Sequence, residues 1–133
     1  VSRLSNYKVL PEANVHQLIM ESDVICALQS TTALESALAN KRVIFPLFYQ
    51  FSDTPYLDNF LWGEHIQLFD VANDVKHFKE LFYEALEQPC VDRHIMKERI
   101  CLFETYFDSY DGVALDKYSK VIESVVSNKN IRQ

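Results

Sequence analysis

The sequence predicts an α/β fold with a parallel sheet, and three observations support this class. Two apolar runs, 24–28 and 42–45, have the composition of strands that are buried on both faces of a sheet. A polar turn and a segment of helical composition, 33–40, lie between these runs. Amphipathic helical patterns follow further along the chain. This order is typical of a βαβ crossover, which places the turn at the carboxyl end of the first strand.

Further elements are expected on both sides of this unit. Tyr7–Leu10 is a short apolar run that ends at Pro11, as a strand or the exit from a strand does. Residues 14–21 have apolar side chains at helical spacing, so a short helix is expected there. The stretch 47–62 mixes aromatic and polar residues without a period, which predicts a long loop with a short helix at 57–61.

The second half of the chain is expected to be mainly helical. His65–Phe69 alternates between apolar and polar residues and predicts one more strand. The first expected helix of this half covers 74–85, with Asn73 or Asp74 as its cap, and Pro89 closes it. A second helix is expected at 92–107. A third is expected at about 115–125, after a turn at Asp111–Gly112. We expect residues 1–126 to form one domain with a helical C-terminal extension, and 127–133 to form a frayed tail. Because the chain begins with Val1, we also expect it to be a piece of a longer protein.

Composition and charge exclude several classes of function. The formal net charge of -6 and the pI near 5.1 argue against a general nucleic-acid-binding protein. No apolar run approaches the roughly 18 residues that a membrane-spanning helix needs. Cys26, Cys90 and Cys101 are odd in number and lack C-x-x-C spacing, so we expect reduced packing residues rather than a disulfide or zinc set. These features together predict a cytoplasmic setting.

Residues 29–35, Gln-Ser-Thr-Thr-Ala-Leu-Glu, form the most informative motif. Their hydroxyl and amide groups meet the free N–H groups of a helix start, where the helix dipole attracts an anion such as phosphate. A structural interpretation is that Thr32, as N-cap, and Glu35, three residues later, form a capping box. One hydroxyl is enough for a cap, so Ser30 and Thr31 are surplus. We therefore predict that Ser30, Thr31 and Thr32 bind a phosphate.

Other polar residues give weaker indications. His16 lies near the start of the first expected helix, where a half-buried surface histidine is the structural alternative to a binding role. Asp53 belongs to the long loop and is either a contact to a ligand or an ordinary solvated residue. His65, His77 and His94 lie in three different elements without metal-ligand spacing, so no metal site is predicted.

Four stretches of the sequence are similar to one enzyme family. Residues 22–25, Ser-Asp-Val-Ile, and 30–44, which open with Ser-Thr-Thr-Ala-Leu-Glu, resemble the donor-binding segment of GT-B glycosyltransferases. Residues 10–19 look like the strand and helix that precede this segment in bacterial surface-polysaccharide and CDP-glycerol transferases. Residues 111–118 look like the start of their closing helix. The resemblance follows the order of the family over most of the chain.

The resemblance implies a Rossmann-like fold, namely the carboxyl-terminal half of a two-domain enzyme that makes cell-surface polysaccharide. Ser30, Thr31 and Thr32 would then contact the phosphates of a nucleotide-linked sugar donor or of CDP-glycerol. Glu35 would accept hydrogen bonds from the ribose hydroxyls or remain the partner in a capping box. No further cofactor is implied, because the nucleotide belongs to the substrate.

The same resemblance places His16 toward the donor cleft. Gln29, directly before the motif, and Asp53, in the loop after the second expected strand, are further candidates for this cleft. The partner of this domain would be an amino-terminal domain that holds the catalytic base, and the whole enzyme would work at the inner face of the membrane. Two alternatives stay open. One is an enzyme related to UDP-N-acetylglucosamine 2-epimerase, and the other is a non-catalytic Rossmann-like interaction module.

Overall fold

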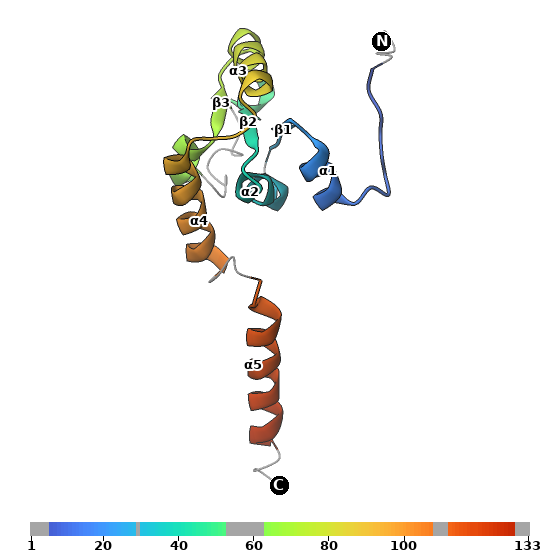
Figure 1. The fold of residues 1–133 in the computed structure, drawn as a ribbon, viewed down its shortest axis with the longest axis vertical. Coiled ribbons are helices and arrows are strands. Elements are labelled where there is room, and N and C mark those ends of the chain that lie inside the picture. The colour runs from blue at the N-terminus through green and yellow to red at the C-terminus, as the bar shows by residue number, and fades with distance from the viewer. Residues whose placement is uncertain (1–5, 29, 53–62, 108–111, 130–133) are drawn as a thin grey trace.

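Three parallel strands form the sheet at the centre of the structure (Figure 1). The computed structural model describes residues 6–28, 30–52, 63–107 and 112–129. The strands are β1 (Val24–Cys26), β2 (Arg42–Pro46) and β3 (Asp70–Ala72), in the order β1-β2-β3. Val24 pairs with Arg42, and Ile44 pairs with Asp70. The predicted α/β class with a parallel sheet is confirmed, and the arrangement is compatible with a Rossmann-like fold.

Helices pack on both faces of this sheet. One face contacts α2 (Thr31–Leu38), on which α4 (Arg93–Phe107) also packs. The other face contacts α3 (Val75–Glu87). The five residues of β2 alternate between the two layers, as strand geometry requires. Both faces are therefore apolar, which explains why the strands read as continuous apolar runs in the sequence.

The core has two parts, one on each side of β2. The α2 and α4 side contains Val43 and Phe45, while Ile44 points to the α3 side. Fully or nearly buried side chains of the first part are Ala33, Leu34, Ala37, Val43, Phe45, Leu68, Phe69 and Leu102. The smaller part contains Ile44, Ala72 and Ala85, covered by half-buried residues of α3. The α2 side thus holds most of the buried apolar residues.

Helix α2 ends in a Schellman motif. Asn40 has a positive φ of 57°, and its N–H donates to the Ala37 carbonyl at 3.2 Å, while the Lys41 N–H donates to the Ser36 carbonyl at 3.0 Å. Asparagine tolerates this left-handed backbone better than most residues. Its side-chain Oδ1 also accepts a hydrogen bond from the Val91 N–H at 3.3 Å. The motif therefore connects the end of α2 to the segment that precedes α4.

Two predicted strands are not present. His65–Phe69 lies mostly in a 3-10 helix, η2 (Gly63–Leu68), and the strand follows at Asp70–Ala72. In this conformation both Leu68 and Phe69 reach the same part of the core, whereas neighbouring side chains on a strand would point to opposite faces of the sheet. Tyr7–Leu10 is irregular and exposed, with no described strand beside it to supply hydrogen bonds.

The expected long loop contains η1 (Tyr49–Phe51) in its described part, and the predicted helix at 57–61 lies outside the described residues. The first helix, α1 (Val15–Glu21), is present, and its N-cap is Asn14. Asp74 caps α3, since its Oδ1 accepts from the His77 N–H at 2.8 Å. Most of the predicted helices are therefore present within one or two residues of their expected bounds.

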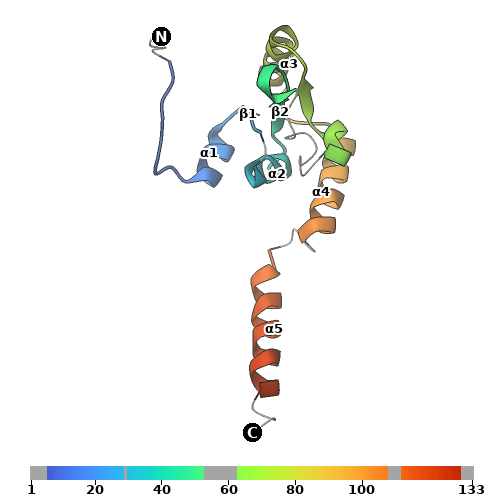
Figure 2. The same cartoon turned by 180° about the vertical axis from the view of Figure 1, so that it is seen from behind.

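The last helix, α5 (Ala114–Lys129), extends away from the other elements, as both views show (Figures 1 and 2). It continues to Lys129, so the tail predicted from residue 127 starts too early. Its apolar residues are all exposed: Leu115, Tyr118, Val121, Ile122, Val125 and Val126. Over the part of the chain that the structure describes, no helix is long and apolar enough to cross a membrane.

Candidate functional site

Helix α2 begins directly after Ser30, near the carboxyl end of β1. The Ser30 backbone is extended, with φ −154° and ψ 145°, and its Oγ accepts a hydrogen bond from the Thr32 N–H at 3.2 Å. Ser30 is therefore the N-cap, and the prediction that Thr32 caps the helix is wrong. Serine is the better capping residue, so Thr31 and Thr32 join the first turn instead.

Thr31 and Thr32 supply the surplus hydroxyls of the motif. Neither hydroxyl makes a hydrogen bond to any residue that the structure describes. Thr31 is exposed and Thr32 is half-buried, and the Thr32 backbone carbonyl accepts from Ser36 Oγ at 2.7 Å. Two uncommitted hydroxyls thus lie on the first turn of α2, where the helix dipole is positive.

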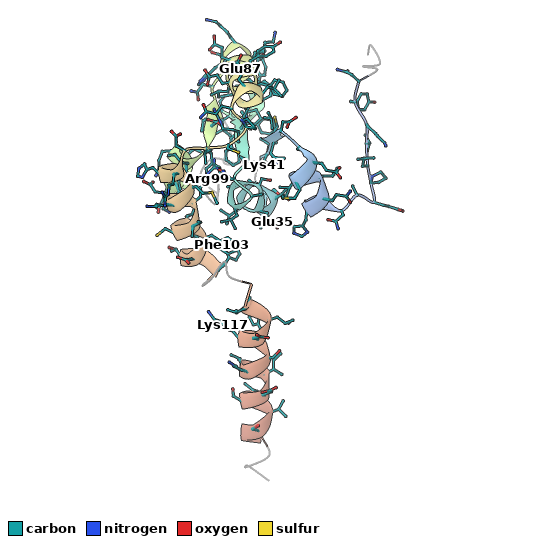
Figure 3. All side chains as sticks on the ribbon, viewed as in Figure 1. Glu35, Lys41, Glu87, Arg99, Phe103 and Lys117 are labelled. Atoms are coloured by element: carbon teal, nitrogen blue, oxygen red, sulfur yellow. The ribbon has the colours of Figure 1, made fainter. Side chains whose placement is uncertain are left out.

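His16 and Glu35 lie together beside this turn. His16 Nε2 on α1 is 3.4 Å from Glu35 Oε2 on α2. The His16 side chain is 80% exposed and the Glu35 side chain 39% exposed, so solvent screens their attraction. Glu35 is the fifth residue of α2, two positions beyond the place of a capping-box carboxylate, so the capping box is wrong. Figure 3 shows Glu35 on the side of α2 that faces α1.

The structure thus brings together five of the seven predicted site residues. Ser30, Thr31, Thr32 and Glu35 come from one helix start, and His16 joins them from α1. The remaining two, Gln29 and Asp53, lie outside the described residues. The arrangement offers hydroxyl donors, one carboxylate acceptor and one titratable imidazole at the carboxyl edge of the sheet, where open parallel sheets commonly bind ligands.

Sequence analysis missed Arg99, the most buried charged residue of the described part of the chain, with 1% exposure. Its Nε and Nη2 donate to the Leu68 carbonyl at 3.0 and 2.8 Å. Its Nη1 donates to the carbonyls of Lys41 at 2.9 Å and Ala37 at 3.4 Å. The guanidinium also lies over the Phe69 ring, 5.5 Å from its centroid. In Figure 3, Arg99 extends from α4 toward the segment around Lys41.

Arg99 therefore joins α4 to the carboxyl end of α2, where a cation also interacts favourably with the helix dipole. Burial, partly offset by Asp70 and assisted by Arg42, lowers the pKa of Arg99 to about 10. The side chain remains a cation at neutral pH. A signal was present in the sequence, because Arg99 lies at helical spacing within the apolar stripe that contains Ile95 and Phe103.

Arg42 and Asp70 form a two-bond ion pair at the opposite, amino-terminal edge of the sheet. Arg42 Nε is 2.6 Å from Asp70 Oδ2, and Arg42 Nη2 is 2.9 Å from Asp70 Oδ1. Their side chains are 14% and 21% exposed. The hydrogen bonds to Asp70 raise the pKa of Arg42. This pair joins the starts of β2 and β3 and lies away from the turn at Ser30.

The cysteines do not have the packing role that was expected. Cys26, Cys90 and Cys101 are free thiols, and all three are exposed. Partial burial still raises the pKa of the Cys26 thiol. Within the described ranges, no three His, Cys, Asp or Glu side chains are grouped so that they could hold a metal ion.

Comparisons with known proteins identify no relative. A scan of protein-family models found no match. Searches of curated proteins and of solved structures likewise found no match.

Proposed function

We propose that this chain is the donor-binding domain of a GT-B-type transferase that uses a nucleotide-linked sugar or CDP-glycerol to build cell-surface polysaccharide. The observation that supports this best is the pair of uncommitted hydroxyls on Thr31 and Thr32, at the first turn of α2. The cap itself needs only Ser30. The other two hydroxyls are therefore free to donate to the phosphate oxygens of the donor.

The chemistry that this turn supplies is electrostatic. In a transfer from a nucleotide-linked donor, negative charge develops on the departing nucleotide phosphate. Fixed donors and a positive helix end stabilise such charge because they need no reorganisation during the reaction. In this proposal, Glu35 accepts hydrogen bonds from the ribose, and His16 neutralises Glu35 when the imidazole is protonated. The catalytic base would lie in the other domain, so this chain alone would bind donor without turning it over.

The exposed apolar face of α5 supports the need for a further domain. Apolar side chains repeat along this helix at spacings of three and four residues, and Leu115 and Tyr118 are 75% and 69% exposed. A contiguous apolar stripe of this kind normally packs against another protein surface. The same observation suits the alternative that the chain is a non-catalytic interaction module, so the test must measure ligand binding.

The test is a titration of the chain with UDP, CMP and CDP, followed through the backbone amide signals. We expect shifts at Thr31, Thr32 and Ala33, with one nucleotide preferred over the others. The variant Thr31→Ala should lose affinity while its free energy of unfolding changes by no more than about 0.5 kcal/mol, because this exposed hydroxyl has no described partner.

A matched control is Thr105→Ala. Thr105 is also an exposed helical threonine, but it lies on α4 and its hydroxyl donates to the Cys101 carbonyl. This variant should bind nucleotide as the parent chain does. If none of the three nucleotides moves the amide signals of residues 30–35, the donor-site proposal is wrong and the interaction module becomes the better interpretation.

A further inference from the structure

A second polar recess lies at the amino-terminal edge of the sheet, and we call it the amino-edge cavity. Its volume is about 240 Å³. The first residues of β2 and β3, Arg42 and Asp70, form part of its wall. The wall also includes Arg99 and Ile95 of α4, the segment 67–69, and the connection between α3 and α4, which contains Asp92. Because parallel strands share their direction, this cavity lies at the sheet edge opposite to the turn at Ser30.

Both arginines of the wall keep unused hydrogen-bond donors. A guanidinium carries five N–H groups, and Arg99 directs only four of them to described acceptors, two to Leu68 and one each to Ala37 and Lys41. Arg42 uses its Nε and Nη2 on Asp70, and its Nη1 has no acceptor among the described residues. Buried donors are normally satisfied by protein or by ordered water, and an anion in the recess would take the place of such water.

The less exposed charges of the wall are the guanidinium groups of Arg42 and Arg99 and the carboxylate of Asp70, two positive and one negative, so this part of the wall favours a negative occupant. Arg99 has 1% exposure and no carboxylate at ion-pair distance among the described residues. Asp70 is the one acidic group in the interior of the wall, and both of its oxygens already bind Arg42. The two guanidinium groups repel each other, since Arg42 disfavours the charged form of Arg99. Two exposed carboxylates oppose an anion here: Asp92 in the wall, and Glu84, whose Oε2 lies 4.0 Å from Arg42 Nη2.

We propose that the amino-edge cavity binds a small oxyanion, a carboxylate or phosphate group, between Arg42 and Arg99. Guanidinium groups match the two-oxygen geometry of both anions. The volume is below the range of about 300 to 1,000 Å³ for pockets that take drug-sized ligands, so it suits one small group with a few waters. This site is separate from the proposed donor site and does not depend on it.

The experiment titrates the chain separately with sodium phosphate and sodium acetate, with sodium chloride at equal ionic strength as the reference. The readouts are the arginine Nε–H signals of Arg42 and Arg99 and the backbone amides of Val91 and Asp92. We expect saturable shifts of these signals with at least one oxyanion. The anion that binds more tightly shows whether the ligand group is a phosphate or a carboxylate.

The variant Asp92→Asn removes the exposed negative charge without touching either arginine. Asp92 directly precedes α4, and its backbone carbonyl accepts from the Met96 N–H. Asparagine is as good as aspartate at a helix N-cap position, so α4 should keep its start. At a separation of roughly 10 Å in a water-like dielectric, removing one negative charge raises the affinity for the oxyanion about twofold, and a lower dielectric gives a larger gain. The matched control Glu104→Gln removes an exposed charge from the far end of α4 and should leave the affinity unchanged.

Three results would overturn the proposal: equal shifts with chloride, no gain in affinity from Asp92→Asn, or phosphate shifts confined to residues 30–35. Such confined shifts would come from the turn at Ser30, and Thr31→Ala would abolish them. Shifts at Val91 and the arginines that persist in Thr31→Ala support the amino-edge cavity even if nucleotides fail to bind elsewhere. The two proposals therefore stand or fall separately.

Discussion

Replacing Arg99 by methionine tests whether this buried arginine stabilises the fold. Methionine has a similar length and a similar helix propensity, so the change mainly removes the guanidinium. The carbonyls of Leu68 and Lys41 would lose their donors from Arg99. The Ala37 carbonyl would keep its hydrogen bonds from the Ala39 and Asn40 N–H groups.

The magnitude follows from these two carbonyls. Each unsatisfied buried group costs about 1 to 3 kcal/mol, so the loss is about 2 to 6 kcal/mol. Removing a buried charge returns part of the desolvation free energy, because burial disfavours the charged form of Arg99. We therefore expect Arg99→Met to lower the free energy of unfolding by about 3 kcal/mol. That is a large share of the 5 to 15 kcal/mol typical of a domain.

The assay is urea unfolding followed by far-UV circular dichroism, with the transition midpoint and the slope fitted for each variant. Arg93→Met is the matched control, since Arg93 is an exposed arginine on the same helix. It should change the free energy of unfolding by less than about 0.5 kcal/mol. If both variants unfold at the same urea concentration, Arg99 does not hold α4 against α2, and the reasoning from its hydrogen bonds is refuted.

Three further predictions concern other described contacts. Ser30→Ala should cost about 1 kcal/mol in urea unfolding because it removes the α2 cap, and an equal loss in Thr32→Ala would contradict this assignment. Asp70→Asn should lower the free energy of unfolding by about 1 to 3 kcal/mol because it weakens the pair with Arg42. Glu84→Gln should lower it by less than about 0.5 kcal/mol, because Glu84 is exposed and 4.0 Å from Arg42 Nη2. Iodoacetamide should label Cys26 more slowly than the other two thiols near neutral pH, because the raised pKa of Cys26 leaves less thiolate. Peptide mass spectrometry measures the three labelling rates, and faster labelling of Cys26 would contradict the prediction.

Local composition was enough to predict much of the architecture. The βαβ unit was predictable because Val43, Ile44 and Phe45 are consecutive apolar residues, and only a strand covered on both faces buries all three. The start of α2 was placed two residues late. Three neighbouring hydroxyls can each cap a helix, and the choice of Ser30 depends on where β1 ends and how α2 packs.

Contacts between distant segments explain the other errors. The alternation in 65–69 is short, and the position of β3 depends on its pairing with β2 rather than on its own pattern. Asp70 was not predicted as a partner of Arg42, because no local pattern relates the two residues. Glu35 and His16 were both named from the sequence, but their contact was not, because it joins two different helices.

The fixed carboxyl end of α2 has a consequence for the opposite end of that helix. Arg99 and Asn40 hold the last turn through hydrogen bonds to three different segments. A helix of eight residues is only about 12 Å long, so little bending can occur between its ends. The orientation of the Thr31 and Thr32 backbone is thus set before any ligand arrives. The protein would therefore lose little conformational entropy when a ligand binds at this turn. More of the interaction energy would then remain as affinity.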